Sequence, residues 1–424
     1  MNLFSGFKEN QQAQRKQVKL GQSQQTTAAD AADQTGDSIS DNIKLRRGED
    51  HVYDHVYDHG YDEGYMARAL QLARKGVTTC HPNPAVGCVI VNNGEVVGEG
   101  WHDFAGRAHA EINALKQAGK SSAGATMYVT LEPCSHHGKT PPCVKSIIKF
   151  RISRAVIATE DPNPRVNGAG IAALRRAGVA VTTGIGEHQS RQLNRGFIKR
   201  ITTGIPWVTL KIATSMDGKT AMANGESQWI TSPPARQDAQ KLRAAASGIL
   251  TGIGTVLRDD PNMNVRLDGV EVQRQPLRII LDTNLSTPAN AKILGGDGAG
   301  GKVLIITANS ADSAAEIFSD DAVEIIHCRT AGGKIDLHEV MLELGQREMN
   351  TILLEAGARL SGSMFEQGLV DEIVVYMAPD LLGGDARDMF TIPRLEQLAD
   401  KLQLEYQDIT RVGRDLRLTL SVAK

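Results

Sequence analysis

The chain has 424 residues, which is enough for two domains of ordinary size and one additional segment. A hydrophobic content of 41% is typical of soluble globular proteins, while a formal net charge of -2 and an aromatic content of 4% argue against a nucleic-acid partner. Five cysteines are too sparse a set for a disulfide framework, and no segment reaches the roughly 20 apolar residues of a membrane-spanning helix, so we expect a cytoplasmic protein without membrane contact.

Residues 1–59 are polar and lack apolar periodicity. They cannot bury enough surface to offset the entropy of ordering, so we predict a disordered extension. The extension ends in a tandem repeat, because residues 51–54 and 55–58 both read His-Val-Tyr-Asp. Histidine and aspartate in tandem can bind metal, but a duplicated low-complexity linker is the favoured interpretation.

Residues 60–186 alternate between helical and strand patterns, which predicts an α/β domain with helices packed on a central sheet. The first helix covers residues 65–73 and ends at Gly76. Apolar runs at 85–91 and 96–101 flank Asn92-Asn93-Gly94-Glu95, a sequence typical of a hairpin turn. The other predicted elements are helices over 109–118, 142–150 and 168–178 and strands over 126–131, 155–159 and 179–183.

A histidine and two cysteines of this domain have the character of zinc ligands. His109, Cys134 and Cys143 supply one imidazole and two sulfurs, and three protein ligands leave a fourth tetrahedral position open for water, as in a catalytic zinc site. Glu111 is badly spaced to bind the same metal but well placed to carry protons beside it. A His-x-Glu motif followed by Pro-Cys and a second Cys is typical of zinc deaminases that act on amino-substituted nucleobases. We interpret Cys80 and Cys88 as small core residues.

The second half of the chain contains another series of strands and helices. Residues 187–205 are predicted to form a linker, helical over 189–200, and residues 206–424 a second α/β domain. This alternation predicts a largely parallel, doubly wound sheet. The predicted strands cover 207–213, 248–251, 277–282, 303–307, 323–327, 350–355 and 372–377, and the predicted helices 235–247 and 335–345.

Two glycine-rich segments of the second domain follow predicted strands. Gly252-Ile253-Gly254-Thr255 lacks the third glycine and the later acidic residue of the usual dinucleotide fingerprint, so this motif is weak when taken alone. Residues 355–363 form a second glycine-rich turn. Backbone N–H groups of two such turns can approach the phosphates of a dinucleotide.

Several long motifs resemble the bifunctional deaminase-reductase family of riboflavin biosynthesis, over roughly residues 60–424. In the first half the resemblance rests on His81-Pro82-Asn83-Pro84-Ala85-Val86-Gly87 and on the eight residues that separate Cys134 from Cys143. In the second half it rests on residues 211–219, 225–231 and 259–266. The resemblance implies a cytidine-deaminase-like three-layer domain followed by a dihydrofolate-reductase-like α/β domain.

The resemblance also implies two reactions and the residues that support them. Zn²⁺ and Glu111 would remove the 2-amino group of 2,5-diamino-6-(5-phosphoribosylamino)pyrimidin-4(3H)-one, and NADPH would then reduce the ribosyl group to a ribityl chain. The expected NADPH-site residues are Ala213, Trp229, Thr255, Asp259, Thr283, Gly357, Ala358, Arg359, Leu360, Ser361, Gly362 and Ser363. The expected substrate-binding residues are Asn83, Ser227, Arg243, Met263, Arg266 and Glu355, the two arginines pairing with phosphate.

Some assignments remain open at this point. Asn83 is either a base-contacting residue or a turn residue, and His136, His137, Lys139 and Thr140 either meet the ribose phosphate or are solvated loop residues. Either a protein group or water delivers the proton of the reduction; Asp217 and Lys211 are the candidate protein groups, although a positional role is the favoured interpretation of each. The alternative functions are a zinc nucleoside or tRNA deaminase with an appended binding domain and a zinc-stabilised, non-enzymatic interaction module. Exposed sheet edges and the family likeness favour a homo-oligomer.

Overall fold

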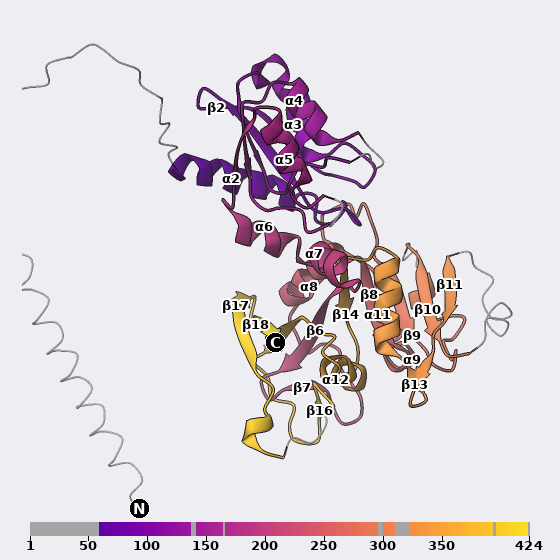
Figure 1. Cartoon of the computed structure of the whole chain (residues 1–424). Coiled ribbons are helices and arrows are strands. Elements are labelled where there is room, and N and C mark those ends of the chain that lie inside the picture. Colours follow the sequence, from indigo (N-terminus) through magenta and orange to yellow (C-terminus); the bar gives the residue numbers. More distant parts are fainter. Residues whose placement is uncertain are drawn as a thin grey trace, which may run out of the picture. The chain divides into compact units, whose positions relative to one another are not determined.

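The computed structural model describes residues 59–136, 141–163, 166–295, 300–309, 322–392 and 396–422 (Figure 1). The extension predicted for residues 1–59 lies outside these ranges except for its last residue, because the first described helix, α2, begins at His59. Residues 58–424 form one compact unit.

The first part of this unit has a five-stranded sheet in the order β2-β1-β3-β4-β5. β1 is antiparallel to both β2 and β3, whereas β3, β4 and β5 are parallel. The predicted hairpin is present, and its turn residues Asn93 and Gly94 have φ values of 51° and 81°, the left-handed region that this type of turn requires. The elements are α2 (His59–Arg74), β1 (Gly87–Asn92), β2 (Glu95–Trp101), α3 (Ala110–Ala118), β3 (Thr126–Val129), α4 (Cys143–Lys149), β4 (Arg154–Ile157), α5 (Ala169–Arg176) and β5 (Ala180–Thr183).

Helices cover both faces of this sheet and make the domain three-layered, as predicted. Met66, Leu70 and Leu72 of α2 pack against Val89 and Val156 on one face. The opposite face is covered by the apolar sides of α3, α4 and α5, through Ala114, Leu115, Ile147, Ile171 and Leu174. The ends of α3 and α4 therefore lie along the same side of the sheet, where the three candidate zinc ligands occur.

Two short helices, α6 (Glu187–Leu193) and α7 (Arg195–Thr203), separate the first sheet from the second. Arg195 of α7 pairs with Glu372 at 2.6 and 2.7 Å, and Lys199 pairs with Asp371 at 2.6 Å. Residues 187–205 are thus attached to the second sheet by ion pairs of largely buried carboxylates.

The second sheet has nine strands in the order β11-β10-β9-β8-β14-β6-β15-β18-β17. All neighbouring strands from β11 to β15 are parallel, and β18 and β17 add an antiparallel edge that the sequence patterns did not predict. The strands of this sheet are β6 (Trp207–Ser215), β8 (Gly248–Gly252), β9 (Leu277–Leu281), β10 (Val303–Thr307), β11 (Val323–His327), β14 (Thr351–Leu354), β15 (Glu372–Ala378), β17 (Leu404–Val412) and β18 (Asp415–Val422). Short two-stranded sheets pair β7 (Lys219–Ala221) with β16 (Arg387–Asp388) and β12 (Thr330–Ala331) with β13 (Lys334–Ile335).

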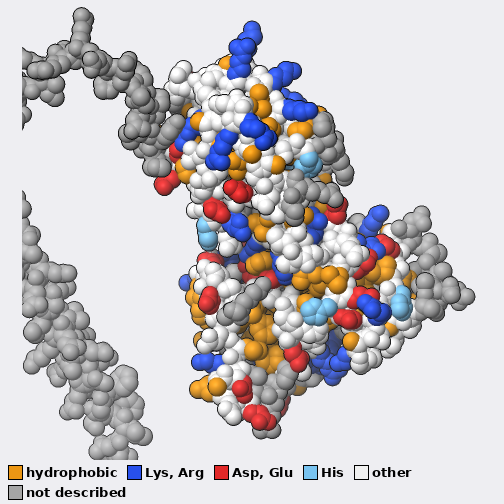
Figure 2. All heavy atoms as spheres, viewed as in Figure 1, with side chains coloured by type: hydrophobic (Ala, Val, Ile, Leu, Met, Phe, Trp, Pro, Cys, Tyr) orange, Lys and Arg blue, Asp and Glu red, His pale blue; other side chains and the backbone are white. Residues whose placement is uncertain are grey.

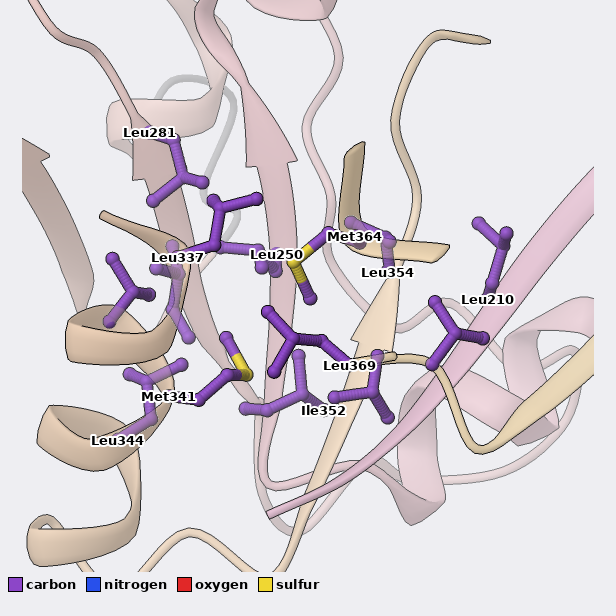
Figure 3. Close-up of a cluster of buried hydrophobic side chains, with 14 of the residues drawn as sticks. Leu210, Leu250, Leu281, Leu337, Met341, Leu344, Ile352, Leu354, Met364 and Leu369 are labelled. Atoms are coloured by element: carbon purple, nitrogen blue, oxygen red, sulfur yellow. The ribbon is translucent and has the colours of Figure 1, made fainter. Parts of the chain in front are cut away.

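The second sheet is also covered on both faces. One core joins β6, β8 and β14 to α11 (Leu337–Gln346) and α12 (Ala358–Glu366), and Figure 3 shows its leucines and methionines in contact between sheet and helices. On the other side, α8 (Pro233–Ala245) packs on Val374 and Tyr376, and α9 (Ile253–Asp259) packs through Val256. Figure 2 shows charged side chains of both signs on the face in view, with Lys and Arg gathered over the first domain.

Candidate functional site

The three predicted zinc ligands converge from three separate elements. His109 is the N-cap of α3, Cys143 is the first residue of α4, and Cys134 lies in the loop after β3. The His109 Nδ1 atom is 3.6 Å from the Cys134 Sγ and 3.3 Å from the Cys143 Sγ, and all three ligand atoms lie within 4.8 Å of one another. A zinc ion bound tetrahedrally by one nitrogen and two sulfurs would separate these atoms by about 3.5 Å, so the two distances from the His109 Nδ1 fit zinc.

The environment favours negative charge on sulfur. The hydrogen bond with Cys143, followed by the one with His109, lowers the pKa of the Cys134 thiol to about 4. The backbone N–H of Cys143 also donates to the Cys134 Sγ at 3.3 Å. In the absence of metal the neighbouring Cys134 thiolate and burial raise the pKa of Cys143, because two adjacent thiolates repel each other. A divalent cation between them would remove that penalty.

Glu111 lies in the first turn of α3, two residues after His109. The residue is only 3% exposed, and burial raises the pKa of its carboxyl group. A carboxyl group with a raised pKa holds a proton more readily than an exposed one, and general acid–base catalysis uses a group that can both accept and return a proton.

Asn83 is held in place by a histidine that the sequence analysis did not single out. The Asn83 Nδ2 atom is 3.0 Å from the His102 Nε2 atom, and the His102 Nδ1 atom is 3.2 Å from the Ala108 carbonyl oxygen. The His102 ring also meets the His109 ring edge-on at 5.3 Å. In the sequence, only the position of His102, directly after β2 and seven residues before His109, could have pointed to a role at this site.

A second unpredicted residue, Glu132, holds the loop beside Cys134. Its buried carboxylate accepts backbone hydrogen bonds from Asp161, Gly168, Gly170 and Ile171, at 2.8–3.2 Å. Charge-assisted bonds of this kind are stronger than neutral ones. Glu132 therefore fixes the segment before α5 and the first turn of α5 against the loop that carries a candidate zinc ligand.

In the second domain, Arg243, Lys211 and Glu355 form a buried charged cluster. The guanidinium of Arg243 donates to both oxygens of Glu355 at 2.6 and 2.9 Å and to the Asn264 carbonyl oxygen at 3.0 Å. The Lys211 Nζ atom is 3.9 Å from the Glu355 carboxylate. Burial alone would raise the pKa of Glu355, but the two cations outweigh it and lower this pKa to about 2, whereas burial lowers the pKa of Lys211.

The predicted substrate residues are only partly brought together. Met263 is buried, and its sulfur lies 3.7 Å from an Arg243 nitrogen. Arg266 is exposed, and within the described part of the chain no carboxylate pairs with it. Partial burial, and after it the nearby charge of Arg243, lowers the pKa of Arg266. Because the guanidinium of Arg243 is hydrogen-bonded to Glu355, it has fewer donors left for a phosphate than we predicted from the sequence.

The second glycine-rich segment is mostly helix, which corrects the predicted turn over residues 355–363. β14 ends at Leu354 and α12 begins at Ala358, so only residues 355–357 form the turn. Gly362 faces the Thr391 backbone, where an added Cβ would meet the carbonyl oxygen at 2.0 Å, and Ser361 is buried. Gly362 is thus explained by close packing, and its side of α12 faces the protein core.

Gly357 and Gly254 differ from Gly362. Neither has a positive φ, and an added Cβ at either position would have no heavy atom within 4 Å. They lie after β14 and β8, which are adjacent parallel strands. These glycines lie at the starts of α9 and α12, where two neighbouring parallel strands end. The open space there would allow a phosphate group to approach the backbone closely.

The other predicted NADPH residues lie in several elements. Ala213 is in β6, Thr255 and Asp259 are in α9, and Thr283 follows β9. Trp229 is 68% exposed, and the Arg236 guanidinium stacks over its ring at 4.4 Å. Ser227 is half-buried in the same segment.

The Asp217 carboxylate is held by hydrogen bonds within the protein. Its carboxylate accepts hydrogen bonds from the Ser215 hydroxyl and from the backbone N–H groups of Leu382 and Gly383. These bonds, the Ser215 bond first, lower the pKa of Asp217 to about 2, so it is a poor proton donor.

His137, Lys139 and Thr140, which we considered for phosphate binding, lie outside the described residues.

Comparisons with known proteins cover both domains. Residues 60–159 match the zinc-binding region of cytidine and deoxycytidylate deaminases, and residues 206–418 match the RibD C-terminal domain. Riboflavin biosynthesis protein RibD of Escherichia coli is 47% identical over 84% of this chain and 98% of its own length, and that of Haemophilus influenzae is 44% identical over 84% and 95%. The structure of Acinetobacter baumannii RibD is similar with a TM-score of 0.80 and 40% identity, covering 87% of this chain and all of that one. A deaminase/reductase structure from Thermotoga maritima is similar with a TM-score of 0.77 and 31% identity, with the same coverage.

Proposed function

This chain belongs to the family of bifunctional riboflavin biosynthesis deaminase-reductases, and from that premise we propose how its residues divide the two reactions. The protein is a zinc-dependent deaminase joined to an NADPH-dependent reductase of riboflavin biosynthesis. The second half matches a reductase, so neither a nucleoside or tRNA deaminase with a binding domain nor a non-enzymatic zinc module describes the chain.

In the deaminase domain we assign zinc to His109, Cys134 and Cys143, whose spacing fits the ion. The chemistry that zinc supplies when bound is Lewis-acid activation of a water molecule. Glu111 would accept one proton of that water and deliver it to the ring nitrogen as the oxygen bonds to the ring carbon. It would then take the second proton from the resulting hydroxyl group and deliver it to the amino group, which leaves as ammonia while the ring carbonyl forms. The raised pKa of Glu111 supports this role. Asn83 donates to His102, so its carbonyl oxygen is directed to accept a hydrogen bond from the pyrimidine.

In the reductase domain we assign the cofactor to the open turns at Gly254 and Gly357, with Ala213, Trp229, Thr255, Asp259, Thr283 and the exposed part of residues 357–363 around it. NADPH supplies a hydride when bound. We assign the substrate phosphate mainly to Arg266, with Ser227 and Met263 beside it. When the ribose C–O bond opens, its oxygen keeps the electron pair and takes a proton from the Lys211–Glu355 pair. Arg243 keeps Glu355 ionised, so Lys211 holds the transferable proton.

The convergence of three zinc ligands on a buried glutamate is the observation that carries the deaminase assignment. Its test is Glu111→Gln, which removes the proton carrier and keeps the size of the side chain. We expect zinc content to be unchanged and ammonia release to fall by at least about a hundredfold. The variant should still oxidise NADPH when it receives the deaminated product. Near-normal ammonia release would remove Glu111 from its role, and loss of both activities would point to misfolding.

We further propose that the protein is a cytoplasmic homo-oligomer. β17 is an edge strand of nine residues that exposes Leu404, Tyr406 and Ile409, and a long apolar edge is a pairing site for another chain. All five cysteines are free, which supports a reducing compartment. Among the described residues, no helix is long and apolar enough to cross a membrane. Light scattering on the purified protein and on Tyr406→Lys tests the assembly, and an oligomeric state unaltered by this change would refute the role of β17.

A further inference from the structure

The loop that carries Asn83 is attached to the reductase domain. It runs from the end of α2 to the start of β1, and Asn83 reaches the deaminase site through His102. The backbone N–H of Asn83 donates to the Cys80 carbonyl at 2.9 Å, which makes residues 80–83 a single tight turn. A displacement of any residue in this turn therefore displaces Asn83.

The His81 imidazole in this turn has its polar contacts with reductase residues. The His81 Nε2 atom is 3.1 Å from the Ala245 carbonyl oxygen, which can only accept, so this nitrogen carries the proton. The His81 Nδ1 atom is 3.1 Å from the Ser247 hydroxyl. The Ser247 oxygen already accepts the backbone N–H groups of Asn350 and Thr351 at 3.1 and 3.2 Å, so the hydroxyl proton is free to point at His81. Both ring nitrogens are thereby fixed in one tautomer.

A second contact joins the same turn to the reductase domain. The Asn350 Nδ2 atom donates to the Pro82 carbonyl at 2.9 Å, one residue before Asn83. The Asn350 side chain is itself oriented by Arg200, whose Nε donates to the Asn350 Oδ1 at 2.7 Å. Asn350 is 3% exposed and directly precedes β14. The donor is therefore rigid, and the turn has little freedom to move while it remains bound.

Further bonds fix the two ends of the loop. Arg274 of the reductase domain donates to the Thr78 carbonyl at 3.1 Å and to the Ala246 carbonyl at 2.6 Å. Asn194, between α6 and α7, binds both the N–H and the carbonyl of Ala85, at 2.8 and 3.0 Å. The segment from Thr78 to Ala85 is thus held at four points by residues that lie beyond the deaminase sheet.

We propose that the reductase domain positions the substrate-contacting Asn83 of the deaminase site, with His81 and Asn350 as the positioning residues. This inference rests on the proposed role of Asn83. The contacts that hold the turn are directional hydrogen bonds, which restrict the orientation of the turn more than apolar contacts would. The deaminase reaction accordingly depends on residues of the other catalytic domain.

The test is Asn350→Asp, a nearly isosteric change in the reductase domain. The new carboxylate still accepts the Arg200 bond, but it places an acceptor against the Pro82 carbonyl where a donor stood. We expect the KM for the diaminopyrimidine substrate to rise and kcat/KM for ammonia release to fall by about tenfold, because one oriented hydrogen bond is replaced by repulsion. Zinc content should stay at the wild-type level. Reductase kinetics with the deaminated product should not change, since Asn350 and Glu355 are at opposite ends of β14.

The matched control is Asn92→Asp, at the far end of β1. Asn92 also donates to backbone carbonyls, those of Ser121 at 2.8 Å and Ala123 at 3.4 Å, but these lie outside the loop of residues 78–85 and the reductase residues that hold it. This control should deaminate at the wild-type rate. Asn350→Ala, which removes the donor without adding charge, should show a smaller defect of the same kind and serves if the aspartate variant does not fold.

The outcomes separate the inference from the function on which it rests. Wild-type protein without ammonia release would refute the deaminase assignment. If the wild-type protein deaminates and the folded Asn350→Asp and Asn350→Ala variants deaminate equally well, the positioning role alone is refuted. Equal losses in both reactions, or a loss of zinc, would also overturn it, because they would indicate general destabilisation.

Discussion

The tautomer of His102 is set by its neighbours. The Ala108 carbonyl can only accept a hydrogen bond, so the His102 Nδ1 carries the proton and its Nε2 is left as an acceptor for the Asn83 amide. Burial also lowers the pKa of His102, which favours the neutral ring. One carbonyl group thus determines, through an imidazole, that the Asn83 Nδ2 faces His102, which leaves the Asn83 Oδ1 for the substrate contact that we propose.

His102→Leu should break this chain without removing a zinc ligand. Leucine fills the buried site, and the Ala108 carbonyl retains a contact with the Asn113 amide at 3.5 Å, so we expect a folded protein with normal zinc content. The Asn83 amide would then be free to rotate. The KM for deamination should rise by about tenfold, in proportion to one lost hydrogen bond, as measured by ammonia release.

His188→Leu is the control for this prediction, because His188 is exposed on α6. It should leave deamination unchanged. A normal KM in His102→Leu would mean that Asn83 is oriented by the turn alone, and a loss of zinc would mean that His102 supports His109 instead.

At the scale of elements, the position of α3 depends on two glycines in β2. Gly98 and Gly100 face the helix, and an added Cβ would lie 2.3 Å from the Ala114 carbonyl oxygen at Gly98 and 2.3 Å from the Ala110 carbonyl oxygen at Gly100. Real atoms do not approach this closely, so any side chain there must displace α3. The first turn of α3 carries Glu111 and follows His109, so these glycines control the geometry of the zinc site.

Gly100→Ala should therefore weaken zinc binding more than it weakens the fold. We expect a displaced α3, zinc occupancy that is lost at lower chelator concentration than in the wild type, and deamination that falls with occupancy. Gly94→Ala serves as the comparison, because an added Cβ at Gly94 meets no atom within 4 Å although its φ is positive. Unchanged zinc retention in Gly100→Ala would show that α3 can shift without moving His109.

The sequence predicted elements best where local chemistry determines them. The hairpin of β1 and β2 and the parallel strands β8, β9 and β10 were found because their turn residues and apolar runs are contiguous. β17 was missed because a register shift between Tyr406 and Asp408 interrupts its alternation of apolar and polar residues. α12 was read as a turn because its glycine serves packing against Thr391, a contact that is distant in sequence.

The same distinction applies to the site. His109, Glu111, Cys134 and Cys143 were predicted from spacing within a short segment, and the structure brings the three candidate ligands together. Glu132 and His102 were missed because their roles consist of hydrogen bonds to residues that are remote or unremarkable in sequence. The partnership of Arg243 with Glu355 joins residues 112 positions apart and could not be read from either motif.

At the scale of the whole molecule, the deaminase loop and the turns to which we assign the cofactor lie at opposite ends of two strands of the second sheet. The deaminase loop contacts Ser247 and Asn350, which directly precede β8 and β14. The open turns at Gly254 and Gly357 follow the same two strands. Strands of four or five residues span about 15 Å, so within one chain the deaminated product has at least this distance to travel.

We therefore predict that the product passes through solvent. Glu111→Gln, in which we expect deamination to be impaired, and Lys211→Ala, in which we expect reduction to be impaired, should together restore NADPH oxidation when they are mixed with substrate. A lag that shortens as protein concentration rises should precede the steady rate, because free product must first accumulate. The control is the deaminated product itself, which Glu111→Gln should reduce without a lag.

A mixture that releases ammonia but does not oxidise NADPH would contradict this prediction, because it would mean that the product reaches only the reductase site of the assembly that made it. Subunit exchange could restore activity without free product, so the variants are compared after crosslinking each protein separately. Oxidation that survives crosslinking requires a diffusing intermediate. Oxidation that disappears would place the transfer inside the oligomer, and the distance between the sites would then have to be bridged by a neighbouring copy of the chain.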